Sequence, residues 1–205
     1  MKILPKFTAG LAALVAIVSV TPSYALIVSV SGQGDKIAPP SKVLDGEATN
    51  RQQQGFEELQ NVLLAADLYF TGGVISAGTR VSSHMIFRNR ETDSTANSIT
   101  TATWTFDGDI LGIMYDQNGV DEFNSTPILG LVSTVYPSPA YDSRGLESND
   151  SLSVSGKTLE VTMIVDQPGD WIRVVTKAVP DAGATISLLG VSLLALVGIR
   201  RRFQS

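Results

Sequence analysis

The long apolar runs of this chain stand at its two ends, which limits how much of the sequence can form a buried core. Residues 9–20 and 182–199 are almost wholly apolar or small, whereas the sequence between them is rich in Ser, Thr, Gly and Asp. The chain contains no Cys, so no disulfide can staple the fold and no thiolate can ligate a metal. The middle of the chain must therefore fold around its own apolar side chains or around bound ions.

The N-terminal 25 residues have the parts of a secretory signal. Lys2 and Lys6 give a positive start, and an apolar run follows over residues 9–20. Small residues precede the bond after Ala25, and the run is short for a membrane span of about 20 residues. We expect a signal helix that is cleaved after Ala25, with an uncleaved membrane anchor as the alternative.

The C-terminal end is built like a membrane segment with a basic stop. Residues 182–199 form an uncharged stretch of 18 residues, long enough to cross the bilayer core as a helix. Arg200, Arg201 and Arg202 follow at once, and basic residues stay on the cytoplasmic side. We expect a C-terminal transmembrane helix, with the middle of the chain outside the inner membrane.

A short motif stands directly before this apolar stretch: Val179, Pro180, Asp181, Ala182 and Gly183. Pro180 ends any helix that enters from the body, so we expect the motif to be extended and accessible. The order of motif, apolar helix and Arg cluster resembles the PEP-CTERM class of sorting signals. The motif itself resembles the variant written VPDSG, with Ala182 in place of the Ser.

That resemblance implies a processing enzyme and a destination. Tails of this class are substrates of exosortases, membrane-embedded cysteine protease-transpeptidases, so cleavage is expected near the motif. The protein would be anchored transiently in the inner membrane and then reach the cell surface or the extracellular space. Exosortase systems generally accompany exopolysaccharide production, which makes extracellular polysaccharide the implied partner. A plain tail anchor is the alternative.

The middle of the chain has the pattern of short antiparallel strands. Trp104 and Phe106 alternate with threonines, as in a half-buried strand. A hairpin is expected over residues 151–165, and a helix over residues 56–68 is a weaker rival reading of that stretch. Prolines predict loops over residues 122–149. We therefore expect a mainly β fold, an antiparallel β-sandwich or jelly roll. The turn signals are Gly72-Gly73, Asp107-Gly108, Asn118-Gly119 and Pro168-Gly169.

Composition divides the chain into four parts. These are a signal peptide (1–25), a flexible N-terminal lead (26–50), a β-sandwich body (51–177) and the sorting signal (178–205). The body resembles a recurring type of uncharacterised exported protein that carries such tails, for example in residues 104–108 and 168–174. Between residues 26 and 179, 10 basic residues face 19 acidic ones, and such an acidic surface repels phosphate backbones. Nucleic acid is therefore excluded as a partner.

One segment of the body has the ligand chemistry that calcium prefers. Asp116, Asn118, Asp121 and Glu122 place four oxygen-bearing side chains around a Gly turn. The spacing does not match an EF-hand, and an ordinary hairpin turn is the competing interpretation. We therefore expect no cofactor, with calcium as the alternative.

No catalytic constellation can be assembled from the sequence. His84 is the single histidine, it stands in a strand-like run, and no nucleophile-elbow motif accompanies any serine. We expect an ordinary hydrogen-bonded core histidine there. The leading hypothesis is a non-enzymatic structural or interaction protein. The alternatives are a carbohydrate- or calcium-binding module, with Tyr136 and Tyr141 as sugar-stacking aromatics, and a secreted hydrolase with paired carboxylates.

Overall fold

The computed structural model describes residues 25–45, 50–89, 98–138, 140, 142–165 and 169–179. Within these ranges the chain is mainly β, as predicted, with one short helix. The elements are β1 (Ile27–Gly32), β2 (Gly34–Lys36), β3 (Gln53–Glu57), β4 (Val62–Leu63), β5 (Leu68–Phe70), β6 (Gly73–Ile75), β7 (Arg80–Arg88), β8 (Ser98–Phe106), β9 (Ile110–Met114), α1 (Val120–Leu129), β10 (Ser151–Ser155), β11 (Thr158–Val165) and β12 (Asp170–Lys177).

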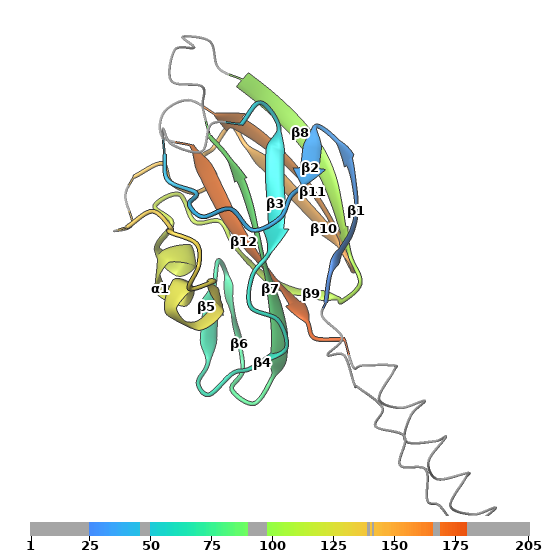
Figure 1. Ribbon diagram of the computed structural model, residues 1–205, viewed down its shortest axis with the longest axis vertical. Coiled ribbons are helices and arrows are strands. Elements are labelled where there is room, and N and C mark those ends of the chain that lie inside the picture. Colours follow the sequence, from blue (N-terminus) through green and yellow to red (C-terminus); the bar gives the residue numbers. More distant parts are fainter. Residues whose placement is uncertain are drawn as a thin grey trace, which may run out of the picture. The chain divides into compact units, whose positions relative to one another are not determined.

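The strands form two larger sheets and a small hairpin sheet (Figure 1). One sheet has the order β1-β8-β11-β10, and every pair in it is antiparallel. The other runs β2-β3-β7-β12-β9, with β4 also paired to β7. Its β2–β3 pair is parallel, which the expectation of a purely antiparallel body did not include. Strands β5 and β6 pair with each other.

A single apolar cluster draws side chains from both large sheets. From the first sheet come residues such as Trp104, Phe106 and Val161, and from the second come Ile86 and Ile172, all fully or almost fully buried. The prediction that Trp104 and Phe106 share the buried face of a strand is confirmed. Burial of apolar area, at roughly 25 cal/mol per Å², is therefore what joins the sheets.

Two glycines let the Trp104 ring lie directly against the opposite sheet. A Cβ atom at Gly55 would stand 2.5 Å from the indole, and one at Gly34 would stand 3.0 Å from it. The indole Nε1 also donates a hydrogen bond to Gln53 Oε1 at 3.0 Å. Glycine weakens a strand by itself, but here it leaves room for the largest side chain of the core.

The predicted turns are confirmed at two hairpins. Residues 151–165 form β10 and β11, and the turn between them uses Gly156 at φ 59°. Gly72, at φ 87°, turns the chain between β5 and β6. Both conformations lie in the left-handed region that glycine adopts without a steric penalty. The rival helix over residues 56–68 is absent, because β3 and β4 occupy that stretch.

The expectation of a flexible lead over residues 26–50 is wrong for its first third. Ile27–Gly32 forms β1 along β8, and Gly34–Lys36 forms β2 along β3. Ile27 is 2% exposed and belongs to the shared apolar cluster. A strand at the start of the lead, around residues 26–28, is consistent with its first apolar residues, but the glycines and short polar residues that follow hide the alternation of β1 and β2.

The expected loop after residue 122 also needs correction. Val120–Leu129 is the helix α1, even though Pro127 stands inside it. The residues that α1 buries are Glu122, Ser125 and Leu129. Because two of these three are polar, the sequence carries no apolar helical period there, and tertiary contacts rather than local propensity must hold the helix.

The predicted signal helix and transmembrane helix fall outside the described residues. Over the ranges that the structure describes, no helix is long and apolar enough to span a membrane.

Replacing Trp104 by Ala should strongly destabilise the body. The change empties a fully buried indole site and leaves Gln53 without its indole partner, and large-to-small core changes of this type cost about 3–5 kcal/mol. Urea unfolding of the purified protein measures the loss. Val28→Ala, at a side chain that is 61% exposed, is the control and should cost far less. Equal stability of the two variants would contradict the packing described for Trp104.

Candidate functional site

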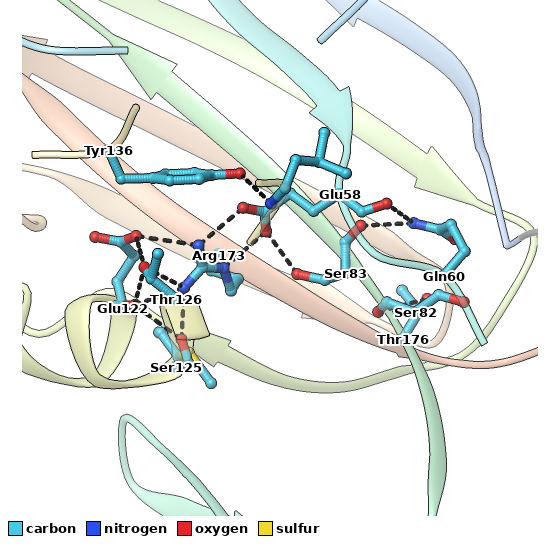
Figure 2. A network of polar contacts seen from close by, with 12 residues as sticks. Glu58, Gln60, Ser82, Ser83, Glu122, Ser125, Thr126, Tyr136, Arg173 and Thr176 are labelled. Carbon is cyan, nitrogen blue, oxygen red and sulfur yellow. Dashed lines mark hydrogen bonds and ion pairs between the residues drawn. The ribbon is translucent and has the colours of Figure 1, made fainter. Parts of the chain in front are cut away.

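A buried arginine in the middle of β12 organises a network of polar contacts (Figure 2). The guanidinium of Arg173 is fully buried and binds both oxygens of Glu58, with Nε to Oε2 at 2.7 Å and Nη2 to Oε1 at 2.8 Å. This bidentate geometry matches the planar fork of arginine to the carboxylate. Glu58 also accepts a hydrogen bond from the Ser83 hydroxyl at 2.6 Å.

The same arginine holds the helix α1. Its Nη1 donates to the Glu122 carbonyl oxygen at 2.5 Å and to the Ser125 and Thr126 hydroxyls at 2.6 and 3.2 Å. Its Nη2 lies 3.2 Å from the Glu122 carboxylate. Figure 2 shows the guanidinium between Glu58 on one side and the helix on the other. Hydrogen bonds to Arg173 therefore hold α1 in place of the apolar contacts that a helix usually makes.

A second buried arginine extends this cluster to the loop after α1. Arg144 forms an ion pair with Glu122 and donates to the Pro137 carbonyl oxygen at 2.6 Å. The Tyr136 hydroxyl accepts a hydrogen bond from the Leu131 amide at 3.0 Å, and its ring lies 5.5 Å from the Arg173 guanidinium. The network thus joins β12, the residue after β3, α1 and the loop that carries Arg144.

The electrostatics of this network keep the arginine charged. Burial alone lowers the pKa of Arg173, but the carboxylates of Glu58 and Glu122 more than offset it, and the net pKa is raised. Burial, with the nearby Glu58 carboxylate, raises the pKa of the Tyr136 phenol. Two arginines and two glutamates balance in charge. The side chains of all four charged residues are buried.

The sequence contains a signal for this site that the strand pattern obscured. Arg173 interrupts an otherwise apolar run in β12, and a charged residue in a fully buried strand requires a partner. The partner could not be read from the sequence, because Glu58 lies 115 residues away and Glu122 lies 51 residues away.

The predicted calcium-binding residues are not all directed to one point. Asp116 accepts hydrogen bonds from the Val120 and Asp121 amides at 2.8 and 3.0 Å, so its carboxylate occupies the first turn of α1. Asp121 accepts from the Thr71 hydroxyl at 3.2 Å. Glu122 points away, into the arginine network. Asn118 remains beside the Gly119 turn, and calcium at this segment stays a prediction.

Asn118-Gly119 does not close a hairpin, contrary to the competing interpretation. Gly119 adopts φ 62° immediately before α1, where its amide donates to the Asp116 carbonyl oxygen at 2.7 Å. Burial and the neighbouring Asp116 raise the pKa of Asp121, with the Thr71 hydroxyl acting against them. The segment is a helix start rather than a strand turn.

His84 has the surroundings of a core residue, as expected. Its side chain is fully buried on β7, its Nε2 lies 3.2 Å from the Thr176 hydroxyl, and its ring packs 4.7 Å from that of Phe106. Desolvation, with a smaller contribution from Lys36, lowers its pKa to about 3. A neutral, enclosed imidazole cannot serve as a proton shuttle to a bound substrate.

The expected sugar-stacking role of Tyr136 is wrong. Its side chain is only 8% exposed, and its hydroxyl is engaged inside the network. A hollow of about 380 Å³ lies beside it, lined among others by Phe123, Pro127 and Pro137. Stacking on a sugar needs an open aromatic face, which Tyr136 does not offer. Tyr141 lies outside the described residues.

Both ends of the body meet at one turn between β8 and β9. The Leu26 amide donates to Asp107 Oδ1 at 2.8 Å, and the Lys177 amide donates to the Asp109 carbonyl oxygen at 2.8 Å. Figure 1 shows the start of β1 and the end of β12 at the same end of the body. The Ala178 amide still pairs with Arg80, so the sheet contacts end one residue before Val179. Ala25 is buried at 1% exposure. The remaining motif residues and the Arg cluster lie outside the described residues.

Comparison with protein families gives one match, at this end of the chain. Residues 178–203 match the VPDSG-CTERM motif. The chain carries an exosortase sorting tail. This confirms the resemblance noted for Val179 to Gly183 and makes the chain an exported protein whose processing partner is an exosortase. No curated protein and no solved structure matches the chain, and the resemblance of the body to other exported proteins stays a prediction.

Removing the charge of Arg173 should destabilise the body far more than breaking a surface ion pair. Arg173→Met leaves the buried Glu58 carboxylate without a cation and Glu122 with Arg144 alone, which costs about 3–5 kcal/mol. Lys36→Met breaks the Lys36–Glu57 pair, where the lysine side chain is 40% exposed, and should cost about 0–1 kcal/mol. Denaturant unfolding of both variants measures the difference.

The double variant Glu58→Gln/Arg173→Met separates loss of charge balance from loss of packing. It removes one buried carboxylate together with the cation and should be less destabilised than Arg173→Met alone. If the two variants are equally unstable, the cost comes from the lost side-chain contacts and not from the uncompensated charge.

His84 should make the body less stable as the pH falls. The unfolded histidine binds a proton below about pH 6.5, whereas the folded one does so only near pH 3. The unfolded state therefore binds more protons in this window, and stability falls by up to about 1.4 kcal/mol per pH unit from this group. Between about pH 3 and pH 6.5, the free energy of unfolding should depend less steeply on pH in His84→Gln than in the wild type. Parallel curves would contradict the lowered pKa.

Proposed function

We propose that the body is a non-enzymatic structural or interaction module of the cell surface, folded as a two-sheet sandwich. After export its tail holds it briefly at the inner membrane, and exosortase cleavage then transfers it to the surface or into extracellular polymer. The observation that carries the proposal is the VPDSG-CTERM match at residues 178–203. It accounts for the apolar stretch and the Arg cluster, which have no role in a folded body.

The arrangement of the chain ends supports processing at both of them. The signal peptide and the sorting motif leave the body beside the same turn, Asp107 to Asp109. Cleavage after Ala25 would place a new amino group at the Leu26 nitrogen, 2.8 Å from the Asp107 carboxylate, and this contact would become an ion pair. Because Ala25 is buried in the folded body, the signal would be cut before folding is complete.

The interior of the body supports a role without catalysis. The buried histidine and the closed arginine network both serve packing, and the Glu58 and Glu122 side chains are committed to arginines. A fold that lacks disulfides but persists outside the cell needs such internal ties. Binding to polysaccharide or to another surface component would use the exterior of the sheets.

The sorting step predicts two distinct failures. Pro180→Ala with Asp181→Ala should leave an anchored, uncut protein, because the membrane helix remains while its recognition motif is lost. Deletion of Arg200, Arg201 and Arg202 should let uncut precursor escape from the membrane, because the basic stop is gone. Cell fractionation and intact mass measurement distinguish the two.

The control places the same substitutions in the body. Asp35→Ala with Pro39→Ala, at two exposed positions, should leave processing unchanged. Wild-type protein should lose residues of its tail in cells with the exosortase and keep them in cells without it. A protein that keeps residues 184–205 in both strains would be a plain tail anchor, and the proposal would be wrong.

A further inference from the structure

Three carboxylates meet on the side of the body where the loop before β10 reaches the start of β12. Glu147, Asp150 and Asp170 each bring an oxygen atom to within 4.8 Å of the other two. Glu147 and Asp150 are partly exposed, whereas Asp170 is 1% exposed. None of them belongs to the segment around Asp116 that the sequence indicated for calcium.

Asp170 makes this cluster more than a set of acidic surface groups. Both of its carboxylate oxygens are buried, and neither has a hydrogen-bond partner. Leaving a buried polar group unpaired costs about 1–3 kcal/mol, and more when the group is charged. An oxygen of Asp170 lies within 4.8 Å of an oxygen of each of the other two carboxylates, so this unpaired buried group faces the cluster.

The spacing of the oxygens fits one bound cation. Calcium binds oxygen at about 2.3–2.6 Å, so two ligands of one ion lie at most about 4.6–5.2 Å apart. The three oxygens lie within that limit. We propose that Glu147, Asp150 and Asp170 form a calcium-binding site, in which Asp170 is the buried ligand and Glu147 and Asp150 keep the ion accessible from solvent.

The ligands are held in place by contacts that do not depend on the ion. Asp150 Oδ1 accepts a hydrogen bond from the Ile164 amide at 2.7 Å, and Oδ2 accepts one from the Glu147 amide at 2.7 Å. The Trp171 amide donates to the Arg144 carbonyl oxygen at 3.0 Å. These bonds join the loop to β11 and β12, so the ion would bind to a preformed frame. An ion there would tie the loop to the sheet.

The surrounding charges favour a cation. Burial, with the charges of Asp150 and Glu147, raises the pKa of Asp170 to about 9, and Arg88 on the neighbouring strand acts in the opposite direction. Burial and Asp150 also raise the pKa of Glu147. The carboxylate of Asp45 lies near this group, at the Gly169 amide.

Calcium should stabilise the exported, processed protein. When free calcium exceeds the Kd about 100-fold, we expect the Tm to rise by roughly 5–10 °C relative to the protein in EGTA. Isothermal titration should give one ion per chain. Magnesium should give a smaller shift, because it prefers a closer and more regular shell.

Two matched variants locate the ion. Asp170→Asn should fold and be at least as stable as the wild type in EGTA, because it removes a carboxyl that is costly to ionise. It should bind calcium at least ten-fold more weakly and lose the Tm shift. Asp121→Asn makes the same carboxylate-to-amide change at the start of α1, in the segment that the sequence indicated for calcium. This variant should keep the Tm shift. Any other pattern overturns the proposal, including no shift in the wild type, a shift kept in Asp170→Asn, or one lost in Asp121→Asn.

Discussion

The fold depends on the buried guanidinium of Arg173, which binds several acidic and polar groups at once. Arg173 stands in the middle of β12, binds Glu58 just after β3 and holds α1 through Glu122, Ser125 and Thr126. The helix has too little apolar surface to dock by the hydrophobic effect, so its position follows from this charge. Specific, directional contacts therefore complete a body whose two sheets are joined by ordinary apolar packing.

A second buried arginine, Arg144, holds the loop after α1 in place. Arg144 pairs with Glu122, and its carbonyl oxygen accepts the Trp171 amide, so the loop is fastened to the helix and to β12 at once. The three carboxylates of the proposed calcium site lie just beyond, at Glu147, Asp150 and Asp170. The buried arginine–glutamate ion pairs and a calcium ion at this site would together cross-link a protein that has no cysteine for disulfides.

The sorting tail and the body have separate tasks that meet at one turn. The family match assigns the tail its delivery role, whereas the body determines where the tail leaves the fold. Leu26 and Lys177 both bond to the turn between Asp107 and Asp109, which places the two ends of the body close together. Processing at both ends would then leave the rest of the surface free for its extracellular role.

Local patterns in the sequence were sufficient for the tail, for the buried face of β8 and for the hairpins at Gly72 and Gly156. A sorting signal acts through composition and order, so residues 178–203 could be recognised without any fold, and alternation placed Trp104 and Phe106 on the buried face. Tertiary structure decided α1, the two strands of the lead and the Arg173 network. These features depend on residues that lie far apart in sequence. In the sequence, Asp170 cannot be distinguished from an exposed acidic residue, because only the fold buries its carboxylate without a hydrogen-bond partner.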